Sequence, residues 1–247
     1  MSKASFSFVV MTWNRGGQRV TNCLYSLIEY QTEPAVEVVL VDTSNQDTIA
    51  TDIRKRAITF DRCRFIQIPR NHLYKSWALN VAIKATDPDV DFVAAVDIDF
   101  MFGQQLVATL KEKMTPDHFL CTEPRRLPEG ADLSDPFSGD NFQALANMTT
   151  GWARYGPAKG PLQCAARDWW FKVHGYDERY AKGLGEMDND TVRRAQKDGL
   201  TFGRLTFEEV YPLHQWHPIS PLKRTFTKPL PNMRVMANPQ GWGQRPK

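Results

Sequence analysis

The sequence predicts an α/β fold in which a mainly parallel sheet is flanked by helices. Short apolar runs of strand length alternate along the chain with segments whose apolar residues recur at helical spacing. The apolar runs are almost continuous, which is typical of parallel strands that are covered on both faces. With 247 residues, of which 42% are hydrophobic and 24% charged, the chain is long enough to bury a core of this kind.

The predicted elements follow one another in a regular order. The predicted strands cover residues 6–12, 36–42, 64–69, 91–97 and 118–122. The predicted helices are a first one marked by Val20, Leu24, Leu27 and Ile28, followed by 47–56, 76–85 and 104–113. From 123 to 160 Pro, Gly, Asp and Asn replace the pattern, so we expect a long irregular segment that is either mobile or functional, for example by shaping an acceptor pocket. A further helix is predicted to begin near Asp188, because carboxylates crowd its first turn and basic residues follow.

Composition narrows the class of protein. No apolar run approaches the length of a membrane-spanning helix, and residues 1–11 lack the pattern of a signal peptide. The cysteines are far apart with no CxxC pair, so we expect reduced thiols in a cytoplasmic protein: Cys23, Cys63, Cys121 and Cys164. The net charge of +3 is too small to indicate nucleic acid binding by itself. After Pro218, however, there are six Lys or Arg residues and no Asp or Glu, which indicates either a solvated, partly extended surface segment or a segment that binds an anion.

Polar residues collect where the predicted strands end. Ligands of such sheets bind outside the carboxyl ends of the strands, and Thr12, Asp42, Asp97 and Asp99 all fall there. We therefore expect a nucleotide or phosphate site at this edge. The GxGxxG fingerprint and the phosphate loop GxxxxGK[ST] are both absent, which argues against an ordinary dehydrogenase or P-loop enzyme.

Asp97 and Asp99 are separated only by Ile98. On an extended segment the two carboxylates point to the same side, so they repel each other unless a positive charge lies between them. Mg²⁺ or Mn²⁺ bound by one or two carboxylates and by substrate phosphates would remove this conflict. The plain alternative is that each aspartate only forms a turn or caps a helix.

These segments resemble the GT-A glycosyltransferases of family 2 over roughly 6–218, and the second half resembles the family 7 galactosyltransferase type. The matching segments are "VVMTWNR", "VLVD", "WALNVAIKA", "AAVDIDFMF", "GYDERYAKGLGEMDNDTVRR" and "YPLHQWHP". The resemblance implies one GT-A catalytic domain over 1–218, with a donor-binding half over 1–122 and an acceptor-binding and catalytic half over 123–218. The basic C-terminal tail then covers 219–247.

The resemblance also implies roles for individual residues. The donor, a nucleotide-diphosphate sugar with UDP favoured although guanine presents N–H groups too, would be bound by Thr12, Asn14, Arg15, Asp42 and Asp97. Asp97 would hold either the donor ribose or a metal-bound water. The divalent cation, Mn²⁺ or else Mg²⁺, would be bound by Asp99, His214 and His217. The histidines lie three apart in "HQWHP", a spacing that lets both rings reach one ion, although either could be a core residue beside Trp216.

The implied general base for the acceptor hydroxyl is Asp188, with Glu186 as the alternative if the alignment shifts. Leu184 and Met187 replace a Trp and a Glu of the family pattern, which leaves the acceptor open: a saccharide, glycolipid, protein or modified nucleic acid. The expected acceptor-binding residues are Leu184, Asn189 and Asp190. Without the resemblance, Asp188 and Asp190 would be interpreted as favourable charges at a helix N-terminus.

The expected function is thus a metal-dependent, inverting sugar transfer by a single displacement. Two alternatives remain. A nucleotidyltransferase of similar layout would also use paired aspartates and a divalent ion, but would release pyrophosphate. A non-catalytic sugar or nucleotide binding module would bind donor and metal without turnover.

Overall fold

The computed structural model describes residues 4–35, 37–151, 161–180, 184–218, 224–226, 230 and 234–244. Within these residues the chain forms a seven-stranded sheet with the strand order β11-β6-β9-β4-β1-β2-β3. The strands of this sheet are β1 (Phe6–Thr12), β2 (Glu37–Asp42), β3 (Cys63–Gln67), β4 (Phe92–Asp97), β6 (His118–Thr122), β9 (Leu162–Ala166) and β11 (Thr201–Leu205). The predicted α/β class with a mostly parallel sheet is confirmed.

The directions of the strands determine which residues meet at the carboxyl edge of the sheet. β1 runs parallel to β2 and β4, β2 is parallel to β3, and β6 is parallel to β11. Only β9 of this sheet is antiparallel to its neighbours, β4 and β6. In register, Thr12 lies opposite Asp42 and Met11 lies opposite Asp97. The carboxyl ends of three central strands therefore meet at one edge, as the sequence predicts.

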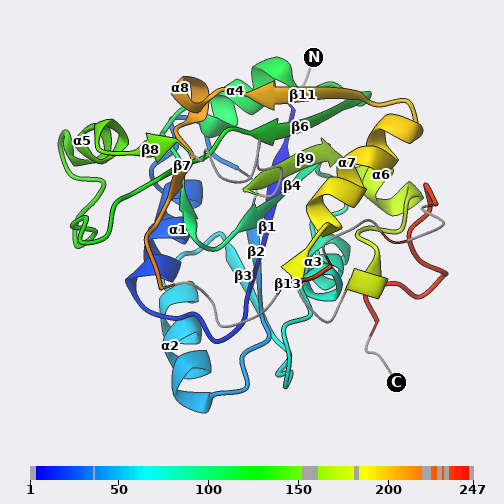
Figure 1. Cartoon of the computed structure of the whole chain (residues 1–247), viewed down its shortest axis with the longest axis horizontal. Coiled ribbons are helices and arrows are strands. Elements are labelled where there is room, and N and C mark those ends of the chain that lie inside the picture. Colours follow the sequence, from blue (N-terminus) through cyan, green and yellow to red (C-terminus); the bar gives the residue numbers. More distant parts are fainter. Residues whose placement is uncertain are drawn as a thin grey trace.

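Helices cover both faces of the sheet. The described helices are α1 (Gln18–Ile28), α2 (Asp47–Ala57), α3 (Lys75–Lys84), α4 (Leu106–Lys113), α5 (Asn141–Asn147), α6 (Arg167–Lys172), α7 (Met187–Lys197) and α8 (Phe207–Val210), with a 3₁₀ turn at Glu178–Tyr180. Figure 1 shows α1 and α2 on one side of the sheet and α3 and α7 on the other. The ends of the predicted helices at 47–56, 76–85 and 104–113 agree with α2, α3 and α4 within two residues.

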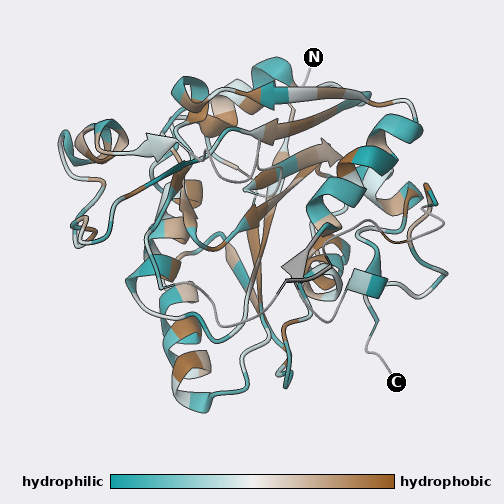
Figure 2. Cartoon of the chain, in the orientation of Figure 1, coloured by the Kyte–Doolittle hydropathy of each residue, from teal (hydrophilic) through white to brown (hydrophobic). Residues whose placement is uncertain are grey.

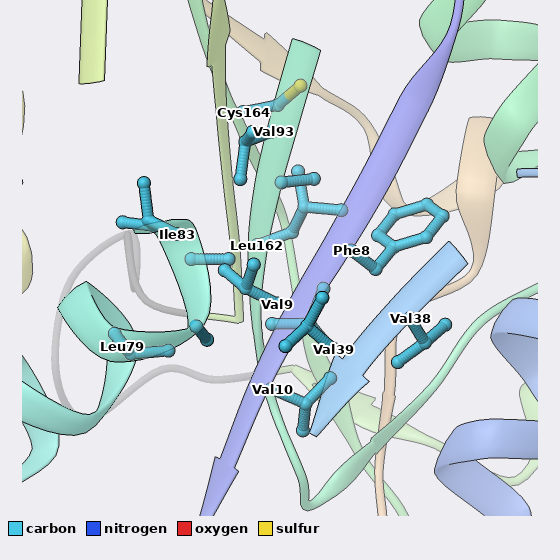
Figure 3. Close-up of a cluster of buried hydrophobic side chains, with 14 of the residues drawn as sticks. Phe8, Val9, Val10, Val38, Val39, Leu79, Ile83, Val93, Leu162 and Cys164 are labelled. Carbon is cyan, nitrogen blue, oxygen red and sulfur yellow. The ribbon is translucent and has the colours of Figure 1, made fainter. Parts of the chain in front are cut away.

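The core forms because the central strands carry apolar residues on both faces. Figure 2 shows hydrophobic residues concentrated on the central strands, with hydrophilic residues along the outer helices. Every residue of β1 and β2 is buried. In Figure 3, Val9 and Val39 point toward Leu79 and Ile83 of α3, whereas Phe8 lies on the other side of β1. Each such side chain contributes roughly 2 kcal/mol by leaving water.

The segment predicted to be irregular contains regular structure, which corrects that expectation. A small sheet joins β5 (Phe100–Met101), β12 (Leu213–His214), β7 (Arg125–Arg126) and β8 (Thr150–Gly151) in that order. It supports a second apolar cluster that includes Leu127 and Phe142 of this segment. The sequence does not indicate β7 or β8, because a strand of two residues is too short to show an alternation of apolar and polar residues. Residues 152–160 of the segment lie outside the described part of the chain.

The described part of the C-terminal tail packs on the domain. Trp242 is buried and lies edge-on to Phe171, with ring centroids 5.4 Å apart. The indole Nε1 of Trp77 on α3 donates to the carbonyl of Gln244 at 2.7 Å. A short strand, β13 (Arg224–Phe226), pairs with β10 (Leu184–Gly185). Residues 234–244 therefore form part of the fold, whereas a role in anion binding stays a prediction.

All four cysteines are free thiols. Among the described residues, no helix combines the length and the apolar character needed to span a membrane.

Candidate functional site

The two aspartates of "DID" separate in the structure. Asp97 is the last residue of β4, whereas Ile98 and Asp99 form a turn that leads into β5. The expectation that both lie on one extended segment is therefore wrong, because the strand ends at the first of them. Asp97 and Asp99 consequently have different partners and can be neutralised separately.

Asp99 meets two histidines from the end of the chain. β12 is antiparallel to β5, with His214 opposite Phe100, and the backbone N–H of Gln215 donates to the carbonyl of Asp99 at 2.8 Å. This pairing brings the candidate ligand atoms of Asp99, His214 and His217 within 4.8 Å of one another. The structure thus groups the three residues that the resemblance implies for the metal.

The ring nitrogens of this cluster suit a cation. Nδ1 of His217 donates to the carbonyl of Pro218 at 2.8 Å, so Nε2 is the nitrogen that faces Asp99, 3.4 Å from its Oδ2. Burial lowers the pKa of His214 to about 4 even though Asp99 is near, so this ring is neutral at pH 7 and offers a lone pair. One carboxylate and two imidazoles are ligands that suit Mn²⁺ well.

Two arginines also contact Asp99. Arg15 follows β1 and donates to Oδ2 of Asp99, and Arg19 in the first turn of α1 donates to Oδ1 at 3.1 Å. Burial opposes ionisation of Asp99, but the contact with His217 and the two guanidinium groups outweigh burial and hold the pKa of Asp99 below its usual value. Because Arg15 uses the same oxygen that faces His217, Arg15 and a cation would compete for it.

The turn after β1 is held by the residues predicted to bind the donor. The hydroxyl of Thr12 donates to the carbonyl of Arg15 at 3.1 Å. Asn14 has a φ of 52°, a left-handed conformation that asparagine tolerates better than most residues. Its side-chain amide donates to Oδ1 of Asn45 at 2.9 Å. Thr12 and Asn14 thus fix the shape of the turn that presents Arg15.

Asp42 is fully buried at the end of β2, next to this turn. Its Oδ1 accepts from the backbone N–H of Ser44 at 2.9 Å. Its Oδ2 is buried and has no hydrogen-bond partner among the described residues. Burial raises the pKa of Asp42, and the hydrogen bonds from Ser44 only partly oppose this. An unpaired buried carboxylate oxygen is costly, so a ligand N–H at this position would be favourable.

Asp97 faces a lysine rather than an arginine. Lys75, the first residue of α3, places Nζ 2.8 Å from Oδ1 of Asp97 and 3.4 Å from Oδ1 of Asp188. Burial alone would lower the pKa of Lys75, but Asp188 and Asp97 outweigh burial and raise it, so the ammonium stays charged. One cation thus joins the end of β4 to the start of α7.

The backbone of Asp188 is held from the sheet. The side-chain amide of Gln163 on β9 donates to the carbonyl of Asp188 at 2.9 Å, and Oε1 of Gln163 accepts from the hydroxyl of Tyr176 at 2.9 Å. No sequence pattern indicated that Lys75, Gln163 or Arg19 belongs to the site. Position at the carboxyl edge could have indicated Lys75, because it begins the helix that follows β3.

The residues expected around the acceptor divide into three groups. Asp190 is buried and pairs with Arg194 at 2.9 Å, with both side chains 1% exposed, so it presents no free face to an acceptor. Glu186 pairs with Arg193 at 3.3 Å, and the amide of Asn189 donates to Glu186 at 3.4 Å. The side chain of Leu184 lies outside the described part of the chain. This arrangement argues against contact between Asp190 and an acceptor.

A comparison with models of known protein families gives a match that includes the strand ends at this edge of the sheet. A family model described as Glycosyl transferase family 2 matches residues 7–147, which is more than half of the chain. The matched span contains Thr12, Asp42, Asp97 and Asp99, and it ends before α7. A search of curated proteins found no match to this chain.

Proposed function

The chain belongs to glycosyl transferase family 2 and is a glycosyltransferase, and from this premise we propose a metal-dependent, inverting transfer. The family implies a nucleotide-sugar donor and an acceptor. The proposed reaction moves the sugar from a nucleotide-diphosphate sugar, with UDP favoured, to an acceptor hydroxyl. Asp188 is the proposed general base.

The observation that carries the proposal is the convergence of Asp99, His214 and His217 at the carboxyl edge of the sheet. Their ligand atoms lie within 4.8 Å of one another, although they come from distant parts of the chain. These three residues would hold Mn²⁺, or else Mg²⁺. A bound ion of this kind neutralises the charge that develops on a leaving diphosphate.

The protein's own groups account for the rest of the reaction. Arg15 and Arg19 beside Asp99 supply further N–H donors to the diphosphate. Asp188 takes the proton of the acceptor hydroxyl as its oxygen attacks the anomeric carbon from the face opposite the diphosphate. The new bond to the acceptor oxygen forms, the bond to the diphosphate oxygen breaks, and the nucleoside diphosphate leaves. One such displacement inverts the anomeric centre.

A uracil base fits the donor side. The unpaired Oδ2 of Asp42 would accept the ring N–H of uracil, and Asp97 would contact the ribose. Thr12 and Asn14 would support the base through the turn that they form. The four free thiols agree with a cytoplasmic enzyme, where cysteines stay reduced.

The second half of the chain is proposed to be of the family 7 galactosyltransferase type. The support is that the two histidines of "HQWHP" meet Asp99 and that Asp188 begins α7 beside Lys75. In this proposal residues 123–218 bind the acceptor, with Glu186 and Asn189 near the base. The acceptor itself stays open among a saccharide, a glycolipid, a protein and a modified nucleic acid.

The test is a panel of nucleotide sugars with and without Mn²⁺, followed by thermal unfolding and then by product analysis. A donor that binds the native state raises Tm in proportion to its occupancy. We expect a UDP-sugar to raise Tm only with the metal, and a nucleoside diphosphate to be released. Release of pyrophosphate would instead show a nucleotidyltransferase, and donor binding without any hydrolysis or transfer would show a binding module.

A further inference from the structure

We infer that Lys75 is a positioning residue for the acceptor base, fixing the carboxylate of Asp188 and linking it to Asp97 on the donor side. The inference rests on the proposed function, because it assumes that Asp188 takes the acceptor proton. Lys75 does not touch the reacting atoms in this proposal. It acts by holding a group that does.

Lys75 lies between Asp97, on the proposed donor side, and Asp188, the proposed base. Its Nζ lies 2.8 Å from Oδ1 of Asp97 and 3.4 Å from Oδ1 of Asp188, and the three side chains are 16%, 32% and 29% exposed. Lys75 is the first residue of α3, Asp97 is the last residue of β4, and Asp188 lies in the first turn of α7. Partial exposure of the two carboxylates leaves each of them reachable by a ligand while the ammonium is largely covered.

The charges explain why a lysine is needed here. Two carboxylates close to the same point repel each other, and an ammonium between them removes most of that repulsion. Without Lys75, the carboxylate of Asp188 would turn toward solvent, since Gln163 holds only its backbone carbonyl. The carbonyl and the carboxylate of Asp188 are thus fixed by two different residues, and among the residues that the structure describes only Lys75 contacts the proposed proton-accepting group.

The support of Lys75 is itself rigid. Trp77 on α3 is buried, and its indole N–H donates a hydrogen bond to the carbonyl of Gln244. The side-chain amide of Asn80 on α3 donates to the carbonyl of Tyr176 at 2.9 Å. α3 also packs on β1 and β2. The ammonium is therefore presented from an element held by the core and by the tail. A base fixed in this way needs little reorganisation when the acceptor arrives.

The experiment is a double-mutant cycle between Lys75 and Asp188, using Lys75→Gln, Asp188→Asn and the double variant. We would measure kcat, the donor KM and the affinity for UDP with Mn²⁺. Lys75→Gln should lower kcat by on the order of tenfold and leave donor KM and UDP affinity nearly unchanged. In the Asp188→Asn background the same change should have almost no further effect, because the two residues act as a unit.

Lys84→Gln is the matched control. Lys84 lies on the same helix, and its Nζ donates to the carbonyl of Trp242 at 3.1 Å. It should lower Tm slightly and leave kcat unchanged. Lys75→Arg keeps the charge but moves it, so its kcat should fall between those of the parent and of Lys75→Gln. If Lys75→Gln does not fold, as judged by circular dichroism, an unchanged kcat in Lys75→Arg would overturn the inference.

The remaining outcomes separate the inference from its premise. Equal loss from Lys75→Gln in both backgrounds would overturn the role of Lys75 alone. A raised donor KM with unchanged kcat would do the same and would make Lys75 a donor contact. Full activity of Asp188→Asn, or no turnover of any nucleotide sugar by the parent, would overturn the proposed base or the proposed function, and the inference with it.

Discussion

Two Asp-x-Asp pairs of the chain, Asp97/Asp99 and Asp188/Asp190, are used by the fold in opposite ways. Asp97 and Asp99 are split by the end of a strand, and each contacts its own basic groups at the edge of the sheet. Asp188 and Asp190 lie in the first turn of α7, where two residues correspond to more than half a turn. Asp188 therefore contacts Lys75 at the site, while Asp190 pairs with Arg194 in the core.

The difference teaches that spacing alone does not say which carboxylates act together. In the first pair, one aspartate ends the strand and the other follows it in the turn, so both lie at the proposed site. In the second pair, Asp188 is the proposed base and Asp190 is a buried ion-pair partner. Substituting the members of each pair separately therefore tests the comparison directly.

The largest effect is expected at Asp99. Asp99→Asn replaces the carboxylate that His214 and His217 approach by a neutral amide, which is a weaker ligand, so Mn²⁺-dependent binding of UDP should be lost in isothermal titration calorimetry. Asp97→Asn is the matched control from the same pair and should retain Mn²⁺ binding. If both variants bind Mn²⁺ and UDP as the parent does, the cation site is wrongly placed and the first pair is not divided as described.

The next effect concerns stability rather than activity. Asp190→Asn leaves the guanidinium of Arg194 buried without its charge partner, since both side chains are 1% exposed. The free energy of unfolding should fall by about 3–5 kcal/mol, which urea denaturation would measure. Asp188→Asn serves as the control and should change stability much less. A stable Asp190→Asn protein with a raised acceptor KM would instead restore Asp190 to the acceptor site.

Asp188→Asn should reduce turnover by on the order of a hundredfold, about 2.7 kcal/mol, because the amide cannot accept the acceptor proton. Donor affinity should stay nearly constant. Steady-state kinetics at saturating donor would measure the loss. Glu186→Gln is the comparison variant, and the opposite result, with Glu186→Gln inactive and Asp188→Asn active, would move the base by two residues and remove the functional member of the second pair.

The smallest effect is expected at Arg15. Arg15→Gln removes a positive charge from the carboxylate oxygen that a cation would use, so Mn²⁺ should bind up to about tenfold more tightly, which corresponds to about 1.4 kcal/mol. Electron paramagnetic resonance of free Mn²⁺ would measure the change in the nucleotide-free protein. Arg54→Gln, at an exposed position on α2, is the control. Unchanged or weaker Mn²⁺ binding would show that Arg15 and the cation do not compete.

The sequence predicted the parts of the molecule whose signals are local. The apolar runs that became β1, β2 and β4 indicated the sheet, and the position of Asp42 and Asp97 at strand ends indicated the edge where they lie. The spacing of His214 and His217 indicated that both rings could reach one ion, and the structure places both rings beside Asp99.

What the sequence did not predict depends on direction and on long-range contact. The separation of Asp97 from Asp99 depends on where the strand ends, which a run of apolar residues does not locate to one residue. The pairing of Lys75 with Asp188 joins two helix starts that no local pattern relates. The burial of Asp190 follows from the orientation of α7 on the sheet, and a surface helix with a different orientation would have exposed it.

The antiparallel pairing of β5 with β12 has a consequence for the order of folding. β1, β2, β3 and β4 can pair from the first part of the chain, but β9 must enter between β4 and β6 before the sheet is continuous. His214 and His217 are synthesised later still, so a growing chain carries Asp99 long before it carries the other two proposed ligands. Such distant contacts form late and slowly. Binding of Mn²⁺ at the proposed site should therefore mark completion of the fold. A ribosome-bound chain that ends before β12 should contain β1, β2 and β4 but should be unable to retain the ion.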